Sequence, residues 1–158
     1  MNELGGLPAP RALERLAEGR RAFPELARLF EERLDVSSDP EVQRTFALKL
    51  ALLYETRLQD DALAIERYRK VLELPGEEMV PLQALDRLLL RTGSTRELAE
   101  VLEREAEVAE EPSDKAEFLF RLGELRAGAL DDLDGALQAF RSALEQEPSH
   151  GGARLAVE

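Results

Sequence analysis

Leucine and alanine recur along most of the chain at intervals of three and four residues, which is the spacing of the buried face of an α-helix. No segment shows the strict alternation of apolar and polar residues that predicts a half-buried β-strand. The pattern therefore predicts an all-α fold of about eight helices, followed by the start of a short helix at the C-terminus. The expected helices cover residues 9–19, 23–36, 40–58, 61–74, 79–92, 95–110, 113–130 and 133–147.

Proline and glycine account for several of the expected helix ends. Pro40 and Pro112 stand in a first helical turn, where the missing N–H group of proline costs nothing. Gly93 provides a helix stop, and Ser94 is the expected cap of the helix that follows. The connections between helices are short, so successive helices are expected to pack antiparallel as hairpins.

The sequence also repeats itself at an offset of 72 residues. When residues 1–86 are aligned with residues 73–158, 20 of the 86 pairs are identical, whereas about 7 are expected by chance. The chain is thus interpreted as one helical-repeat domain over 1–158, made of two copies at about 9–76 and 79–148. Each copy holds two hairpins, and residues 149–158 begin a further unit or form a cap. Hairpins stacked in series make an α-solenoid, in which neighbouring hairpins bury each other's apolar faces.

The fourth hairpin resembles a tetratricopeptide repeat. The resemblance is carried by Leu122-Gly123 in its first helix and by Ala136, Phe140, Ala143 and Pro148 in and after its second. The small residues let the two helices approach closely, and Phe140 fills the space between them. The second hairpin is similar, with Leu50-Ala51, Tyr54, Ala64 and Tyr68 at the matching places. The resemblance implies binding of peptides or protein surfaces in a groove lined by the first helix of each hairpin.

Composition narrows the classes of partner. Apolar residues make up 44% of the chain and charged residues 34%, which suits a folded soluble protein. The net charge of −12 would repel phosphate groups, so neither nucleic acid nor an anionic membrane is an expected partner. No signal peptide or membrane-spanning segment is recognised in the sequence, which favours a cytoplasmic location. The excess of arginine over lysine is typical of GC-rich genomes and favours a bacterial source.

The residue types required for common catalytic sites are sparse. The chain has no cysteine and one histidine, His150, in a segment expected to be a solvent-exposed loop. A catalytic triad and a transition-metal site both need partners that are missing here. Asp131, Asp132 and Asp134 lack the loop length and terminal glutamate of a calcium site, and are interpreted as the start of a helix. The sequence therefore predicts no enzyme activity, no cofactor and no metal.

Two sets of residues are candidates for binding a partner at the groove. The first is apolar and lies off the expected core stripe of the first helices: Leu48, Leu52, Leu90 and Phe120. An exposed apolar row would be a protein-binding surface, but the same residues could instead pack against the adjacent hairpin. The second set is basic: Lys49, Arg87, Arg91 and Arg121, with Arg11 and Arg15 nearby. These could attract an acidic peptide, or they could form ordinary ion pairs with neighbouring glutamates.

The acidic helix expected over 95–110 is interpreted differently. Its charged positions are read as a face exposed to solvent: Glu97, Glu100, Glu103, Glu105, Glu107 and Glu110. The leading hypothesis for the whole chain is a scaffold or adaptor that binds a protein or peptide through its concave face. The alternative is a structural module that assembles with further copies of itself, or a fragment of a longer array.

Overall fold

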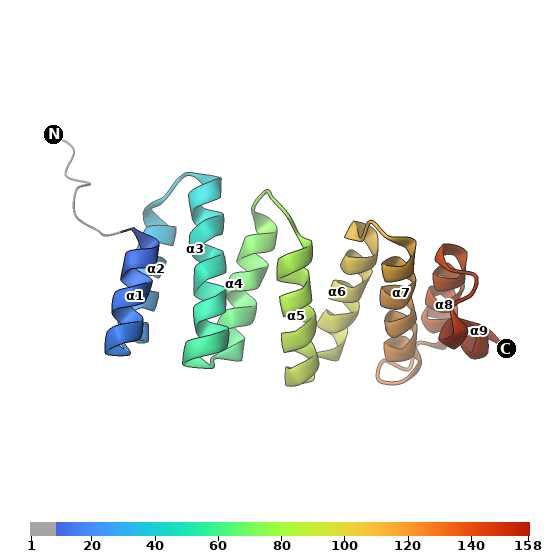
Figure 1. The fold of residues 1–158 in the computed structure, drawn as a ribbon. Coiled ribbons are helices and arrows are strands. Elements are labelled where there is room, and N and C mark those ends of the chain that lie inside the picture. Colours follow the sequence, from blue (N-terminus) through green and yellow to red (C-terminus); the bar gives the residue numbers. More distant parts are fainter. Residues whose placement is uncertain (1–8) are drawn as a thin grey trace. The chain divides into compact units, whose positions relative to one another are not determined.

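The computed structural model describes residues 9–158, and within this range all regular elements are helical (Figure 1). The all-α fold predicted from the sequence is confirmed. The helices are α1 (Pro10–Arg20), α2 (Phe23–Val36), α3 (Pro40–Leu53), the short π-helix η1 (Tyr54–Leu58), α4 (Asp61–Glu73), α5 (Met79–Thr92), α6 (Thr95–Val108), α7 (Pro112–Ala127), α8 (Leu133–Gln146) and α9 (Gly151–Val157). The last of these, α9, is the short C-terminal helix that the pattern predicts.

The chain divides into two compact units, unit 1 (Met1–Pro75) and unit 2 (Gly76–Glu158). In unit 1, α1 packs on α2, α2 on α3 and α3 on α4. In unit 2 the same order of contacts runs from α5 through α6, α7 and α8 to α9. Each helix therefore packs mainly on its neighbours in sequence, as is typical of helical repeats. The division falls close to the boundary between the two sequence copies.

Several helix ends follow the local signals. Pro40 and Pro112 each occupy the first position of their helix, as expected. Gly93 ends α5 with a φ of 72°, a left-handed conformation that glycine adopts at no steric cost. Ser94 occupies the N-cap position of α6 as expected, but its side chain makes no capping hydrogen bond. Its hydroxyl lies 3.2 Å from that of Thr92 instead.

The helix expected over 40–58 is α-helical only in its first part. Regular α-helix stops at Leu53, and Tyr54–Leu58 forms the π-helical turn η1. The turn closes through a hydrogen bond of 2.9 Å from the Asp60 N–H to the Tyr54 carbonyl, after Gln59 adopts a left-handed conformation. A π-turn inserts an extra residue into the helical register, so side chains within it point in directions that an α-helical pattern does not predict.

The core of unit 1 is closed by aromatic packing and by a side chain that satisfies a helix end. The rings of Phe30 and Phe46 lie 5.4 Å apart between α2 and α3. Arg44 of α3 donates hydrogen bonds to the carbonyls of Val71 (2.8 Å) and Leu74 (3.1 Å) at the end of α4. The Val71 carbonyl also accepts a hydrogen bond from the Leu74 N–H, and both carbonyls lie at the C-terminal end of α4, where regular helical hydrogen bonds end. The arginine therefore fixes α3 against the end of α4.

The core of unit 2 depends on the close approach of α7 and α8. A Cβ atom placed on Gly123 would lie 2.4 Å from Cε1 of Phe140, so no larger residue fits there without a shift. Ala136 and Ala143, on α8, are likewise almost completely buried. The packing of small residues around Phe140 is the one that the sequence predicts for the fourth hairpin.

The prediction that the glutamates of helix 95–110 are exposed to solvent is wrong for Glu105. This side chain is fully buried on α6, and neither carboxylate oxygen has a hydrogen-bond partner among the described residues. Burial, together with the nearby charge of Asp86, raises the pKa of Glu105 to about 7, although Arg121 opposes the shift. An unpaired carboxyl in this position destabilises the packing of unit 2 whenever it is ionised.

Candidate functional site

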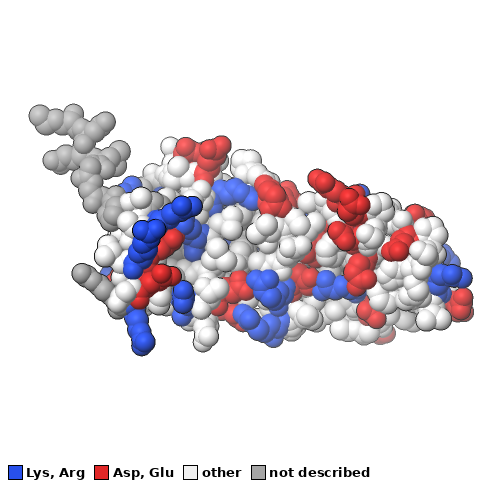
Figure 2. All heavy atoms as spheres, in the orientation of Figure 1, with Lys and Arg blue, Asp and Glu red and all other residues white. Residues whose placement is uncertain are grey.

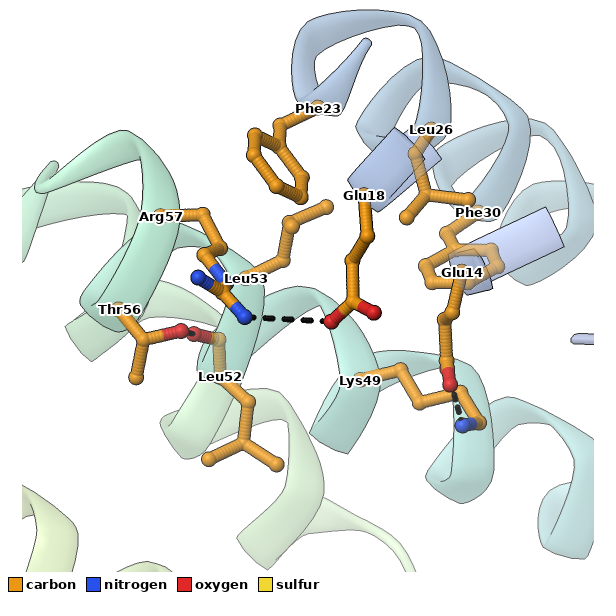
Figure 3. A pocket seen from close by; sticks show the side chains of 10 residues that line it. All are labelled: Glu14, Glu18, Phe23, Leu26, Phe30, Lys49, Leu52, Leu53, Thr56 and Arg57. Carbon is orange, nitrogen blue, oxygen red and sulfur yellow. Dashed lines mark hydrogen bonds and ion pairs between the residues drawn. The ribbon is translucent and has the colours of Figure 1, made fainter. Parts of the chain in front are cut away.

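A pocket with a volume of about 250 Å³ opens in unit 1 beside α1, α2, α3 and η1 (Figure 3). Its lining combines apolar side chains with two pairs of opposite charges. The lining residues are Glu14, Glu18, Phe23, Leu26, Phe30, Lys49, Leu52, Leu53, Thr56 and Arg57.

The pocket exists because α1 packs on α2 and reaches α3 and η1 through long charged side chains. Lys49 of α3 forms an ion pair with Glu14, and Arg57 of η1 forms one with Glu18 over 3.2 Å (Figure 3). These side chains leave room between the helices for the pocket. Both pairs are partly or largely exposed, so each contributes less than about 1 kcal/mol to stability. A ligand could rearrange them at small cost.

The π-turn η1 determines the position of Arg57. This guanidinium lies 5.3 Å from the centroid of the Phe23 ring, in addition to its ion pair with Glu18. In an uninterrupted α-helix, residue 57 would follow Leu50 and Leu53 on the buried stripe, because residues three and four apart share a face. The extra residue of the π-turn moves Arg57 out of that stripe and to the mouth of the pocket.

The floor of the pocket is apolar and its rim carries an exposed leucine. Leu26, Phe30 and Leu53 are between 1% and 7% exposed, and belong to the core of unit 1. Leu52, one residue before Leu53, is 47% exposed at the rim. Burying such a side chain against a partner would gain roughly 1 kcal/mol or more, so the leucine is a source of binding energy.

Comparison with known proteins agrees with the helical-repeat geometry. Residues 117–150, which include most of α7 and all of α8, match the tetratricopeptide repeat family. The chain is also similar to the crystal structure of MamA, with a TM-score of 0.55 and 15% sequence identity. That alignment covers 96% of this chain and 82% of the MamA chain. A search of curated protein sequences found no match.

This chain has a tetratricopeptide-like fold. The first helix of each tetratricopeptide-like hairpin was expected to contribute to a groove, and in unit 1 these helices are α1 and α3. Of the residues predicted to bind a partner, Lys49 and Leu52 both line the pocket between them. Leu48, on the same helix, is partly buried and packs against the core of unit 1. Its packing favours the alternative interpretation, in which Leu48 stabilises the hairpin.

In the tetratricopeptide-like unit 2, the predicted residues do not gather at one place. Leu90 is 63% exposed on α5, where Arg87 and Arg91 are exposed as well. Arg121 donates two hydrogen bonds of 2.7 Å to the carboxylate of Asp86, and this contact raises the pKa of Arg121. This bidentate pairing favours the interpretation in which Arg121 forms an ion pair within the chain, since its guanidinium already holds a carboxylate.

Phe120 is partly buried at the end of unit 2. Its ring lies 5.7 Å from that of Phe140 and 4.9 Å from that of His150, and a Cβ atom on Gly152 would lie 2.6 Å from it. These contacts join α7 to α8 and α9 and favour a packing role for Phe120. His150 is also less exposed than expected, at 13%, because its Nδ1 atom accepts a hydrogen bond from the Ala153 N–H at the start of α9.

Sequence reasoning missed the acidic half of the pocket, Glu14 and Glu18, and the cation Arg57. One signal was present in the repeat. At the offset of 72 residues, Glu14 corresponds to Asp86 and Lys49 to Arg121, so both copies place an acid and a base at the same two positions. Both pairs form ion pairs in the structure. Charges that recur in this way predict a contact within each copy. The repeat gives no such indication for Arg57, which corresponds to Ala129 in the second copy and whose position depends on the π-turn.

Two further observations concern other classes of site. Within residues 9–158 there is no group of three or more histidine, aspartate or glutamate side chains able to hold a metal ion. The same range contains no helix with the length and apolar character needed to cross a bilayer.

Proposed function

We propose that this protein is an interaction module that binds a partner protein or peptide through the pocket of unit 1. The observation that carries the proposal is the combination of an apolar floor, an exposed rim residue, Leu52, and weakly held charges in one concave site. Binding sites for protein segments have this composition, with an apolar centre and a polar rim. The tetratricopeptide-like fold supports the proposal, because such folds commonly serve protein interaction.

A second candidate function, assembly with further copies of the chain, is favoured by a different surface. In unit 2 a shallow hollow is lined by Phe120, Phe140 and Gly152 together with Leu155 of α9. Leu155 is 76% exposed there. An apolar side chain next to an apolar hollow is a feature of surfaces that associate.

The test of the proposed function compares Leu52→Glu with Leu16→Glu. Leu16 is 53% exposed on α1 and does not line the pocket, so it is a matched control of the same residue type in the same unit. We expect both variants to fold, with circular dichroism unchanged from the wild type. In affinity capture from source cells, with quantitative mass spectrometry, the partner should be recovered by the wild type and Leu16→Glu but lost with Leu52→Glu.

Equal recovery with both variants would contradict the role of the pocket. Light scattering coupled to size exclusion, over a wide range of concentration, tests the second candidate function by measuring self-association. Self-association that disappears with Leu155→Glu but persists with Leu52→Glu would favour assembly through unit 2.

A further inference from the structure

We infer that unit 2 carries a docking site for a basic protein segment, in a groove formed where α5 begins, α6 ends and α7 begins. The groove lies between the residues just before α5, the connection from α6 to α7 and the first two turns of α7. It is called the acidic groove below. All of its residues belong to unit 2, so it is separate from the pocket of unit 1 and does not depend on the function proposed for that pocket.

The acidic groove is large enough for a protein segment and has apolar side chains inside it. Its volume is about 650 Å³, within the range of roughly 300 to 1,000 Å³ that is typical of ligand sites. Met79 of α5, Val108 of α6 and Phe118 of α7 line it, and each of them is only partly buried. Covering their remaining apolar surface would favour binding of a partner.

The charged side chains of the groove are all acidic. Its lining contains five carboxylates and no lysine or arginine; the five are Glu77, Glu78, Glu110, Glu111 and Asp114. Arg104, outside the lining, pairs with Glu78 over 2.8 Å. Among the described side chains no basic group forms an ion pair with Glu110, Glu111 or Asp114, and all three are exposed. Figure 2 shows acidic side chains gathered over the connection between α6 and α7.

Helix stability alone does not account for these acids. The Glu77 carboxylate accepts a hydrogen bond from the Val80 N–H and so contributes to the start of α5. Glu111 occupies the N-cap position of α7, but its side chain makes no capping hydrogen bond. The start of a helix carries only roughly half a unit of positive charge, and the end of α6 carries the opposite sign. The helix dipoles therefore leave the groove strongly negative.

Lysine and arginine suit both parts of this lining. Their aliphatic stems cover apolar surface while their charged groups reach the carboxylates. An arginine can also stack on an aromatic ring such as that of Phe118. A metal ion is a poorer match, because the part of the chain that the structure describes holds no group of three or more acidic side chains able to bind one. Dispersed positive charges on a peptide fit the dispersed carboxylates.

The first copy of the repeat lacks this set of acids. At the offset of 72 residues, Val108 corresponds to Val36 and Phe118 to Phe46, so the apolar lining belongs to the repeat itself. Only Glu111 keeps an acidic counterpart, Asp39. The other four acids, Glu77, Glu78, Glu110 and Asp114, correspond to Gly5, Gly6, Ser38 and Val42. Packing of the repeat therefore does not require these carboxylates, and the acidic groove is particular to unit 2.

The experiment is a selection from a random peptide library displayed on phage, with the full chain as bait, followed by fluorescence anisotropy with the enriched peptides. We expect these peptides to carry two or more lysine or arginine residues beside an apolar residue. The triple variant Glu110→Gln, Glu111→Gln and Asp114→Asn should weaken their binding by about tenfold or more, and should make it less dependent on salt. Met79→Gln should weaken it by about threefold, since it removes apolar contact.

A second triple variant controls for the overall negative charge of the chain. Glu100→Gln, Asp134→Asn and Glu145→Gln remove three charges from exposed positions of unit 2 outside the groove. Asp134 stands in the first turn of α8 as Asp114 does in that of α7. This control should keep the affinity within about twofold of the wild type. Circular dichroism should show the same helix content in all variants.

The remaining outcomes decide against the inference. Basic peptides that bind both triple variants equally would show attraction to the net charge and overturn the assignment to the groove. Selection of only acidic or uncharged peptides, or of none above the level found with the first triple variant as bait, would contradict a basic partner. Spermine that competes as strongly as the peptides, residue for charge, would indicate a small polyamine ligand instead. Leu52→Glu should leave the binding unchanged, so failure here is distinct from failure of the unit 1 pocket.

Discussion

Replacing Glu105 with glutamine should stabilise unit 2 at pH 8 by about 3 kcal/mol, and should have little effect near pH 4. The two side chains have almost the same shape, so the substitution removes the charge and keeps the packing. Glu105 is fully buried on α6 with both carboxylate oxygens unpartnered, which makes its ionised form costly. A change of this size is large compared with the total stability of a small domain.

The direction of the pH dependence follows from the raised pKa. The pKa of Glu105 is about 7 in the folded chain, against an ordinary value of 4.5. Below pH 4.5 the carboxyl is protonated in both states and its pKa difference has no effect on stability. As the pH rises from 4.5 to about 7, the folded state keeps a proton that the unfolded state has lost, so folding stability falls. Above pH 7 the folded state carries the buried charge and the full cost applies.

Urea denaturation of the wild type and Glu105→Gln at a series of pH values measures this effect. The wild type should lose stability between pH 4.5 and 7 relative to the variant, and the two curves should run parallel above that range. Glu100→Gln is the matched control. Glu100 is exposed on the same helix, so its replacement should not change how stability depends on pH. A constant offset between wild type and Glu105→Gln at every pH would contradict the account of Glu105.

Replacing Gly123 with alanine should destabilise unit 2 by about 2 kcal/mol, although alanine is the better helix former. The new Cβ atom would lie 2.4 Å from Cε1 of Phe140, and the Phe140 ring is itself packed against Phe120. The helix-propensity gain of roughly 1 kcal/mol is smaller than the cost of forcing the two helices apart. The steric conflict should therefore make the net change in stability unfavourable.

A second substitution identifies the cause of this loss. Phe140→Leu alone should destabilise the wild type by about 1 kcal/mol, but in Gly123→Ala it should restore part of the lost stability. Gly19→Ala is the control, because a Cβ atom there meets nothing within 4 Å and should leave the protein equally or more stable. Denaturation of the wild type, the two single variants and the double variant measures the coupling between positions 123 and 140. Additive effects of the changes at positions 123 and 140 would contradict a direct contact.

Much of the fold could be predicted from the sequence because the repeat signals are local. Pro40, Pro112 and Gly93 act within one helical turn, and the apolar spacing between them is regular. The π-turn η1 could not be predicted, since residues 41–60 contain no proline or glycine that would mark a change in the helix at Tyr54. Glu105 was misassigned for a related reason. It is one of several glutamates on α6, and only the packing of α5 and α7 distinguishes the buried one.

The candidate site was predicted only in part. Helical spacing placed Leu52 and Lys49 off the core stripe, and both line the pocket. The same reasoning gave Leu48 equal weight, but its packing against the core depends on neighbouring helices. Phe120 was uncertain in the same way, because its partners come from α8 and from residues around α9. Spacing along one helix shows which side chains leave its core stripe, but not which of them another element then covers.

The most direct measurement of the central claim is photo-crosslinking in source cells, with p-benzoylphenylalanine placed at position 52 or at position 16. If unit 1 binds a partner through its pocket, position 52 should yield a covalent adduct with another protein and position 16 should not. Equal adducts at both positions, or an adduct at position 52 that contains only a second copy of this chain, would contradict the account.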